Sequence, residues 1–173
     1  MGGVLDWILS LHQSHPELRL ELAGRLVMAA IMGGAIGWER QHAHKPAGLR
    51  TNILICMGAA LFTDLSARVS EMGTGPADPG RIAAQIVTGM GFLGAGSIIQ
   101  SRGSVTGLTT AATLWVVAAI GMAVGFGAVV EAAGTTILVL IVLIPLRSLE
   151  ARAESGQHHR EKDDPGSGPS PEI

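Results

Sequence analysis

Residues 81–99, RIAAQIVTGMGFLGAGSII, decide the fold that we predict for this chain. The stretch carries no charge after Arg81, and as an α-helix it is about as long as the ~30 Å hydrocarbon layer of a bilayer. Small residues recur on one face at steps of four, three and four, namely Ala84, Thr88, Gly91 and Ala95. Small residues let helices approach closely in lipid, where no hydrophobic effect holds them together. We therefore predict a small-residue membrane helix at the centre of a bundle.

Further glycines in this stretch, Gly89, Gly94 and Gly96, are predicted to belong to the same packing helix. Residues 89–94, GMGFLG, also match the spacing of a dinucleotide-binding loop. Such a loop follows a strand and has an acidic residue about 20 positions later. Here an apolar helical stretch precedes the motif, and the next acidic residue is Glu131. We therefore interpret these glycines as helix-packing positions.

Composition indicates a membrane protein. The chain is 47% hydrophobic and only 15% charged, well below the roughly one quarter of charged residues in soluble domains. Its charges cluster between five apolar stretches near the ~20 residues that a spanning helix needs. These stretches are residues 20–38, 51–69, 81–99, 109–125 and 129–146. The sequence thus predicts an all-α membrane protein, a five-span transmembrane helix bundle formed by residues 20–146.

Lysine and arginine set the predicted orientation. With the N-terminus outside, the cytoplasmic segments hold Arg40, Lys45, Arg50, Arg102, Arg147, Arg152, Arg160 and Lys162, against Arg19, Arg68 and Arg81 outside. We predict an outside N-terminus and a cytoplasmic C-terminus. Residues 1–19 are interpreted as an N-terminal segment with an interfacial helix around Trp7. Residues 147–173 are polar and rich in Pro and Gly, so we expect a disordered cytoplasmic tail after at most a short continuation of the last helix.

Ionisable residues at membrane depth are functional hypotheses by default. One predicted layer, toward the outside, holds Glu21, Arg25, Asp64, Arg68, Arg81 and Glu131, with Asp78 in the adjoining loop, and the other holds Glu39, Arg40, Arg50 and Arg102. Glu21–Arg25 and Asp64–Arg68 are each four residues apart, so each pair can neutralise itself on one helix face. For Asp64, deeper in its span, an ion pair and a functional role stay equally open. Gln85 either extends the outer layer inward or bonds to another helix.

Glu39 lies in a loop with several cations, WERQHAHKPAGLR at residues 38–50. One interpretation is that this basic loop only sets the topology of the protein. The other is that Glu39 binds a cation or pairs with Arg50. Magnesium prefers a few carboxylates and retained waters, so one carboxylate among arginines is a poor site. Glu39 and Asp64 remain the metal-ligand hypotheses, and no cofactor is predicted other than Mg²⁺ as ligand or substrate.

Two more ladders of small residues are predicted to pack helices, Ala29–Gly33–Gly37 and Gly121–Gly125. They favour either intramolecular contacts or a homodimer. Thr109, Thr110 and Thr113 are expected to bond back to their own helix. Trp115 lies deep in its span, so we expect its indole N–H to find a partner inside. We find no Ser/His/Asp, CxxC or HExxH arrangement and no Walker lysine, so we predict no enzyme.

Five sequence blocks together resemble the MgtC/SapB family of bacterial inner-membrane proteins. They are GWERQ (37–41), AGLRT (47–51), DPGRIAAQIV (78–87), GFLGAG (91–96) and GLTTAATLW (107–115). The resemblance singles out as functional their polar members and a tryptophan: Glu39, Arg40, Arg50, Thr51, Asp78, Arg81, Gln85, Thr109, Thr110 and Trp115. Asp64 falls outside the blocks.

The resemblance implies a multi-pass protein of the bacterial inner membrane, tied to growth in low magnesium and, in pathogens, to virulence. The better-known members of that family resemble regulators of other membrane machinery, including ATP synthase. Many carry a C-terminal ACT-like domain where this chain has a short polar tail. Two hypotheses follow: a non-enzymatic regulator acting by helix–helix contact, or a small transporter or channel for Mg²⁺ or another ion. The expected partners are the lipid bilayer, a second copy and other membrane proteins, with no nucleic acid.

Overall fold

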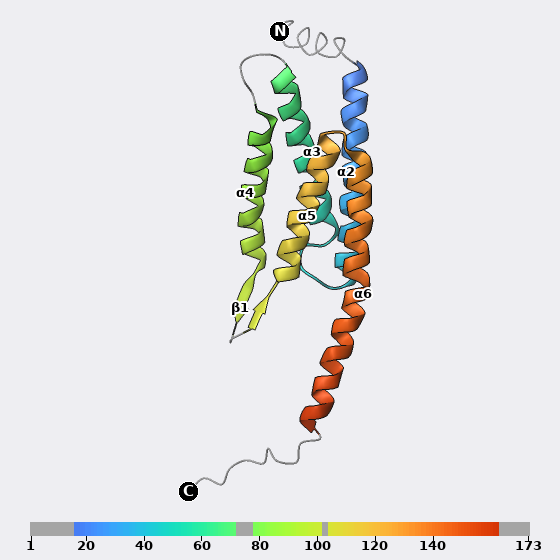
Figure 1. The fold of residues 1–173 in the computed structure, drawn as a ribbon, viewed down its shortest axis with the longest axis vertical. Coiled ribbons are helices and arrows are strands. Elements are labelled where there is room, and N and C mark those ends of the chain that lie inside the picture. Colours follow the sequence, from blue (N-terminus) through green and yellow to red (C-terminus); the bar gives the residue numbers. More distant parts are fainter. Residues whose placement is uncertain (1–15, 72–77, 102–103, 163–173) are drawn as a thin grey trace, which may run out of the picture.

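The computed structural model describes residues 16–71, 78–101 and 104–162, which form five helices and one β-hairpin (Figure 1). In chain order they are α2 (Pro16–His42), α3 (Leu49–Glu71), α4 (Pro79–Ser97), β1 (Ile99–Ser101), β2 (Ser104–Thr106), α5 (Leu108–Gly125) and α6 (Val129–Lys162). Most of the predicted N-terminal segment lies outside the described residues. Successive helices run in alternating directions along the long axis of the molecule (Figure 1).

The core lies where α2, α3 and α5 meet, with α6 covering one side. Fully buried side chains there include Ile36, Cys56, Val117, Ile120 and Val124. The buried residues repeat at helical spacing on each helix: Ala29, Met32 and Ile36 on α2, Cys56 and Ala60 on α3, and the three on α5. Most of the largest fully buried side chains of the described residues lie in this three-helix core.

The two ladders on α2 and α5 form intramolecular contacts in this core. A Cβ added at Gly33 would lie 2.6 Å from the Asn52 carbonyl oxygen, and one at Gly37 would lie 2.8 Å from Leu49 Cα. A Cβ at Gly125 would lie 2.6 Å from the Ala60 carbonyl oxygen, and one at Gly121 would overlap the Cys56 carbonyl oxygen. Glycine is therefore needed at these positions because backbone of α3 occupies the space of a side chain.

The glycine-rich helix α4 lies at one edge of the molecule (Figure 1). Its Met90 is buried against α3 and α5 beside Ala59, Leu114 and Ala118. The predicted small-residue stripe, Ala84, Thr88, Gly91 and Ala95, is exposed instead. The prediction that this helix is the centre of the bundle is therefore wrong, because its larger residues make the contacts that attach it.

Among the described residues, three helices are long and apolar enough to cross a membrane: Leu20–His42, Leu49–Ser70 and Leu108–Gly125. A shorter apolar helix covers Val129–Pro145. The described residues therefore form an all-helical, multi-pass membrane protein apart from the hairpin, and the described helix α4 is not among these candidate spans.

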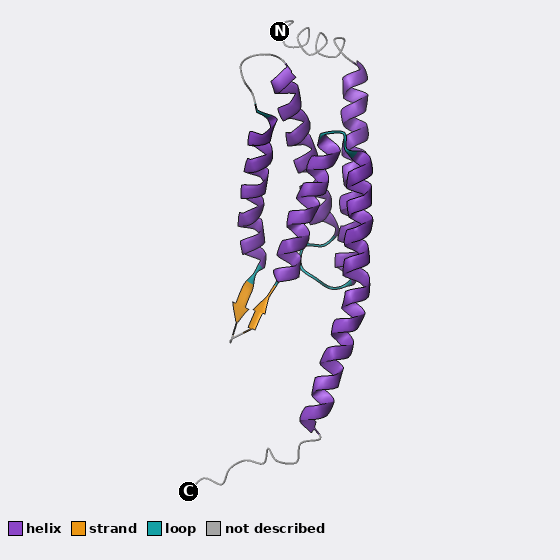
Figure 2. Cartoon of the chain, in the orientation of Figure 1, coloured by secondary structure: helices purple, strands orange, loops and turns teal. Residues whose placement is uncertain are grey.

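The connection after α4 is an antiparallel hairpin, with Ile99 opposite Thr106 and Gln100 opposite Val105 (Figure 2). One local feature differs from the sequence prediction. Helix α6 continues to Lys162, well past residue 147 where a disordered tail was predicted to begin. The segment after 147, SLEARAE from Ser148, is rich in Leu, Glu, Ala and Arg, which are strong helix formers.

Candidate functional site

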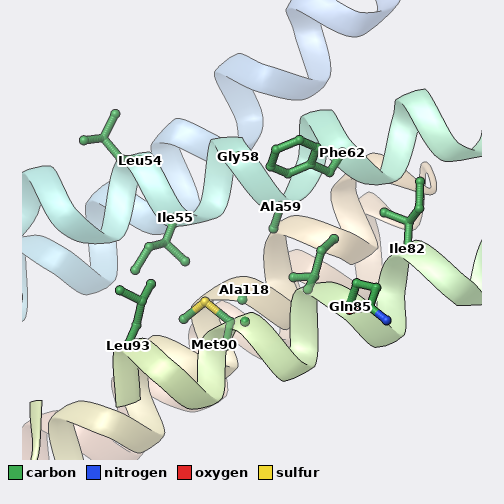
Figure 3. Close-up of a pocket in the computed structure, with 12 residues that line it drawn as sticks. Leu54, Ile55, Gly58, Ala59, Phe62, Ile82, Gln85, Met90, Leu93 and Ala118 are labelled. Atoms are coloured by element: carbon green, nitrogen blue, oxygen red, sulfur yellow. The ribbon is translucent and has the colours of Figure 1, made fainter. Parts of the chain in front are cut away.

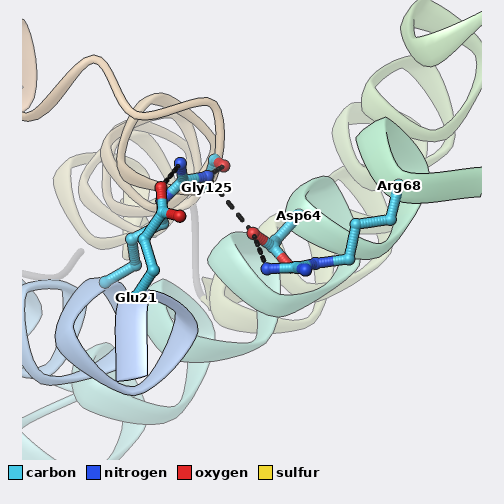
Figure 4. Close-up of polar contacts among 5 residues, drawn as sticks. Glu21, Asp64, Arg68 and Gly125 are labelled. Atoms are coloured by element: carbon cyan, nitrogen blue, oxygen red, sulfur yellow. Dashed lines mark hydrogen bonds and ion pairs between the residues drawn. The ribbon is translucent and has the colours of Figure 1, made fainter. Parts of the chain in front are cut away.

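A network of four charged side chains joins α2, α3 and α5 at the end of the bundle where α2 begins (Figure 4). Both predicted ion pairs form: Glu21 pairs with Arg25, and Asp64 Oδ2 lies 2.5 Å from Arg68 Nε. Arg25 Nη1 connects the two pairs, because it lies 3.2 Å from Asp64 Oδ1. The same atom donates a hydrogen bond of 2.6 Å to the carbonyl oxygen of Gly125. We call these four side chains the Asp64 network.

The Asp64 network neutralises charges that would be costly away from water. The Asp64 side chain is 3% exposed and the two arginines are about a quarter exposed, at 23% and 24%. The last carbonyls of a helix lack partners within the helix and carry partial negative charge. Arg25 satisfies one of them at the end of α5, where Gly125 ends the helix. The network thus fixes three helices together at one end.

Arg81, Asp78 and Gln85 lie at the same end, on α4 and just before it. Asp78 caps α4, because its Oδ1 accepts a 2.8 Å hydrogen bond from the Gly80 amide. Arg81 and Gln85 line a small pocket with Ser66 of α3. No described residue forms an ion pair with Arg81. Gln85 is exposed, so within the described chain it does not link two helices.

A second buried ion pair lies at the opposite end of α2, about 22 Å along the helix from Arg25. Arg40 Nε lies 2.5 Å from Glu39 Oε2, with the side chains 4% and 10% exposed. Glu39 therefore has Arg40 as its partner, and the alternative pairing with Arg50 does not occur. Arg50 and Thr51 are exposed. The predicted polar residues thus separate into two groups, at the two ends of the bundle.

Asn52 holds the turn between α2 and α3, and the sequence predictions did not include it. Its side-chain amide donates to the carbonyl oxygens of Ala47 at 2.6 Å and Gly48 at 2.8 Å. Ala47 has a positive φ of 58°, so this turn holds a strained backbone in place. The sequence did contain a signal for this role, because Asn52 is a polar amide directly after Arg50-Thr51, at the start of an apolar stretch. The first two resembling blocks therefore meet here as one packed turn.

The predicted residues of α5 have mostly local roles. Thr113 Oγ1 donates to the Thr109 carbonyl oxygen at 2.7 Å, as predicted, and Thr110 is buried. The prediction for Trp115 is wrong. Trp115 is 52% exposed on the outside of the bundle, and no described residue bonds to its indole. An exposed aromatic ring on a membrane helix faces lipid. Trp115 can therefore lie deep in its span without a partner inside the bundle.

Metal ligands do not gather in the part of the chain that the structure describes. No group of three His, Cys, Asp or Glu residues lies close enough there to hold a metal ion. The two metal-ligand candidates, Glu39 and Asp64, lie at opposite ends and each faces arginine. Their geometry favours neutralised ion pairs.

Comparison with known proteins identifies the family. A model described as "MgtC family" matches residues 26–152. The chain belongs to the MgtC family. This match extends over all five blocks quoted above, from the α2–α3 turn to the first half of α5.

Named relatives cover most of this chain. It is 47% identical over 139 residues to "Putative magnesium transporter YhiD" of Escherichia coli K12, covering 78% of this chain and 65% of that protein. It is 49% identical over 127 residues to the MgtC proteins of Brucella abortus and Salmonella typhimurium, covering 73% of this chain. The chain spans about half the length of those two proteins, 52% and 53%. None of these names states a catalytic activity, and no solved structure gives a significant match.

Proposed function

We propose that this MgtC-family protein is a non-enzymatic regulator of the bacterial inner membrane that supports adaptation to low magnesium and, in a pathogen, virulence. In this proposal it has five spans with the N-terminus outside and the C-terminus in the cytoplasm. It acts by packing against other membrane proteins. The observation that carries the proposal is the open small-residue face of α4, made of Ala84, Thr88, Gly91 and Ala95.

The open face of α4 differs from the small-residue ladders on α2 and α5, which the backbone of α3 fills. A Cβ at Gly91 or Gly96 would meet no atom within 4 Å, whereas Gly94, on another side of α4, is buried beside Ala111 of α5. Helices associate in lipid through close backbone approach at small residues. A partner helix could therefore approach α4 as closely as α3 approaches α5. A second copy of this chain and a larger machine such as ATP synthase, which the family resemblance implies, are the proposed partners.

The paired charges support a regulator over a transporter. Asp64 contacts two arginines and Glu39 contacts one, so neither carboxylate is available to bind Mg²⁺ without breaking an ion pair. Magnesium loses its waters reluctantly and is usually held by several oxygen ligands. The described residues offer no cluster of that kind.

A magnesium transporter or channel is the second candidate. It is favoured by one observation, the nearly complete burial of the Asp64 side chain within an apolar span. Buried carboxylates in membrane helices often mark ion pathways. The name of the Escherichia coli relative points the same way for that protein.

Magnesium flux into liposomes tests the choice. Purified protein is reconstituted with a magnesium-sensitive dye inside the vesicles, and protein-free vesicles serve as the baseline. We expect no protein-dependent flux. Flux that Asp64→Asn or Glu39→Gln abolishes would establish the transporter instead. Glu131→Gln is the matched control, because Glu131 is an exposed acid on α6 without an ion pair to any described residue.

A further inference from the structure

We propose that the space between α3 and α4 binds one phospholipid with a protonated amine in its headgroup. One acyl chain would lie in an apolar groove, and the headgroup would lie between Asp78 and Arg81. This inference is independent of the proposed function, because it uses the opposite face of α4 from the open small-residue face. It rests on two adjoining pockets and their charges.

The apolar groove has a volume of about 480 Å³ and lies between α3 and α4, with Ala118 of α5 at its base (Figure 3). Leu54 and Phe62 line it from α3, and Ile82 and Leu93 from α4. Two glycines leave it open: a Cβ at Gly58 or Gly89 would meet no atom within 4 Å. Every lining side chain except Gln85 is apolar or absent.

The length and the lining of the groove match an acyl chain. From Ile82 to Leu93 it follows α4 for about 16 Å, roughly half of the ~30 Å hydrocarbon layer and thus one leaflet. Its lining is almost wholly apolar, and at the end where α4 begins it adjoins a pocket with charged residues. A phospholipid has the same order of parts, an acyl chain that leads to a polar headgroup at the edge of the hydrocarbon layer.

A polar pocket of about 290 Å³ continues the groove at the end where α4 begins. Ile82 and Gln85 line both spaces, and the other described residues that line the polar one are Ser66, Val69, Asp78 and Arg81. No described carboxylate pairs with the Arg81 guanidinium, which matches phosphate geometry with two parallel hydrogen bonds. Asp78 uses Oδ1 for its cap, and its other carboxylate oxygen has no hydrogen bond to any described residue.

The charges in the polar pocket select the headgroup. A guanidinium and a carboxylate together complement a headgroup that carries both a phosphate and an ammonium group. A headgroup with a phosphate alone would place its negative charge beside Asp78. The surrounding bilayer is as apolar as the groove, so moving an acyl chain into the groove adds little driving force. Headgroup contacts therefore determine which lipid is retained.

Native mass spectrometry of the full chain, released from detergent with defined lipids added, tests the proposal. We expect one phosphatidylethanolamine per chain, retained at least tenfold better than phosphatidylcholine, which lacks N–H donors, or phosphatidylglycerol, which lacks the amine. Gly58→Leu fills the groove and should abolish retention. Gly134→Leu is the matched control, because a Cβ at Gly134 also meets nothing within 4 Å, outside the groove.

Two further variants separate the headgroup contacts from folding. Asp78→Asn keeps a side chain that caps the helix and removes the charge, so the preference over phosphatidylcholine should disappear. Arg81→Gln should reduce retention of both lipids. Circular dichroism and gel filtration confirm that each variant is folded. Equal retention of all three lipids, retention unchanged by Gly58→Leu, or a dimer that Gly58→Leu disperses would overturn the proposal.

Discussion

The three-helix core and helix α4 use the same small residues in opposite ways. In the core, Gly33 and Gly121 touch the backbone of α3, and no side chain would fit. On α4, Gly91 and Gly96 face open space. The two regions also differ in their ion pairs. The Asp64 network joins α2, α3 and α5, whereas Arg81 on α4 pairs with no described residue. Stability and partner binding are thus assigned to different helices.

The largest expected effect comes from the Asp64 network. Asp64→Ala should lower the free energy of unfolding by about 3 kcal/mol, because it leaves two arginines without their carboxylate. This is the low end for a broken buried pair, since both arginines are about a quarter exposed. Arg81→Ala on α4 should change it by less than about 0.5 kcal/mol. Unfolding in mixed micelles measures both, and equal losses would contradict the difference between core and α4.

Single methyl groups should separate the two kinds of glycine. Gly121→Ala should destabilise the fold by about 2 kcal/mol, because its Cβ overlaps the Cys56 carbonyl oxygen and α5 must shift. Gly91→Ala should be neutral or stabilising by up to about 1 kcal/mol, because alanine favours helix and meets nothing there. Thermal unfolding in detergent provides the comparison. A loss at Gly91 as large as at Gly121 would show that α4 is packed on both faces.

A smaller effect is expected at the turn between α2 and α3. Asn52→Ala removes two hydrogen bonds to turn carbonyls and should cost about 1 kcal/mol. Thr51→Ala is the control, because Thr51 is an exposed neighbour on the same helix. The same unfolding assay measures both variants. If Thr51→Ala costs as much, the turn is not held by Asn52.

Patterns within one helix predicted the fold better than contacts between helices. The i,i+4 pairs Glu21–Arg25 and Asp64–Arg68 follow from spacing alone, and the structure contains both. The Arg25–Asp64 contact that joins them depends on how α2 and α3 align, which no local pattern encodes. Glu39 shows the same limit. In the structure it pairs with the adjacent Arg40 and not with Arg50, the partner that the sequence analysis considered across the turn.

Small-residue spacing identified packing surfaces without identifying what fills them. Three ladders have the same appearance in the sequence, yet two are filled by α3 and the third, on α4, is open. The difference arises because Ile86 and Met90 attach α4 by its larger residues. Trp115 was misassigned for a related reason, because depth in a span does not say which face a residue occupies.

Photo-crosslinking in intact membranes tests the central claim, that the open face of α4 binds another protein, most directly. A benzoylphenylalanine at position 91 is compared with one at position 134, because Gly91 and Gly134 are both exposed helix positions with free space around them. We predict a discrete protein adduct, to a second copy or to one other membrane protein, from position 91 and none from position 134. Lipid adducts alone from both positions would contradict the claim.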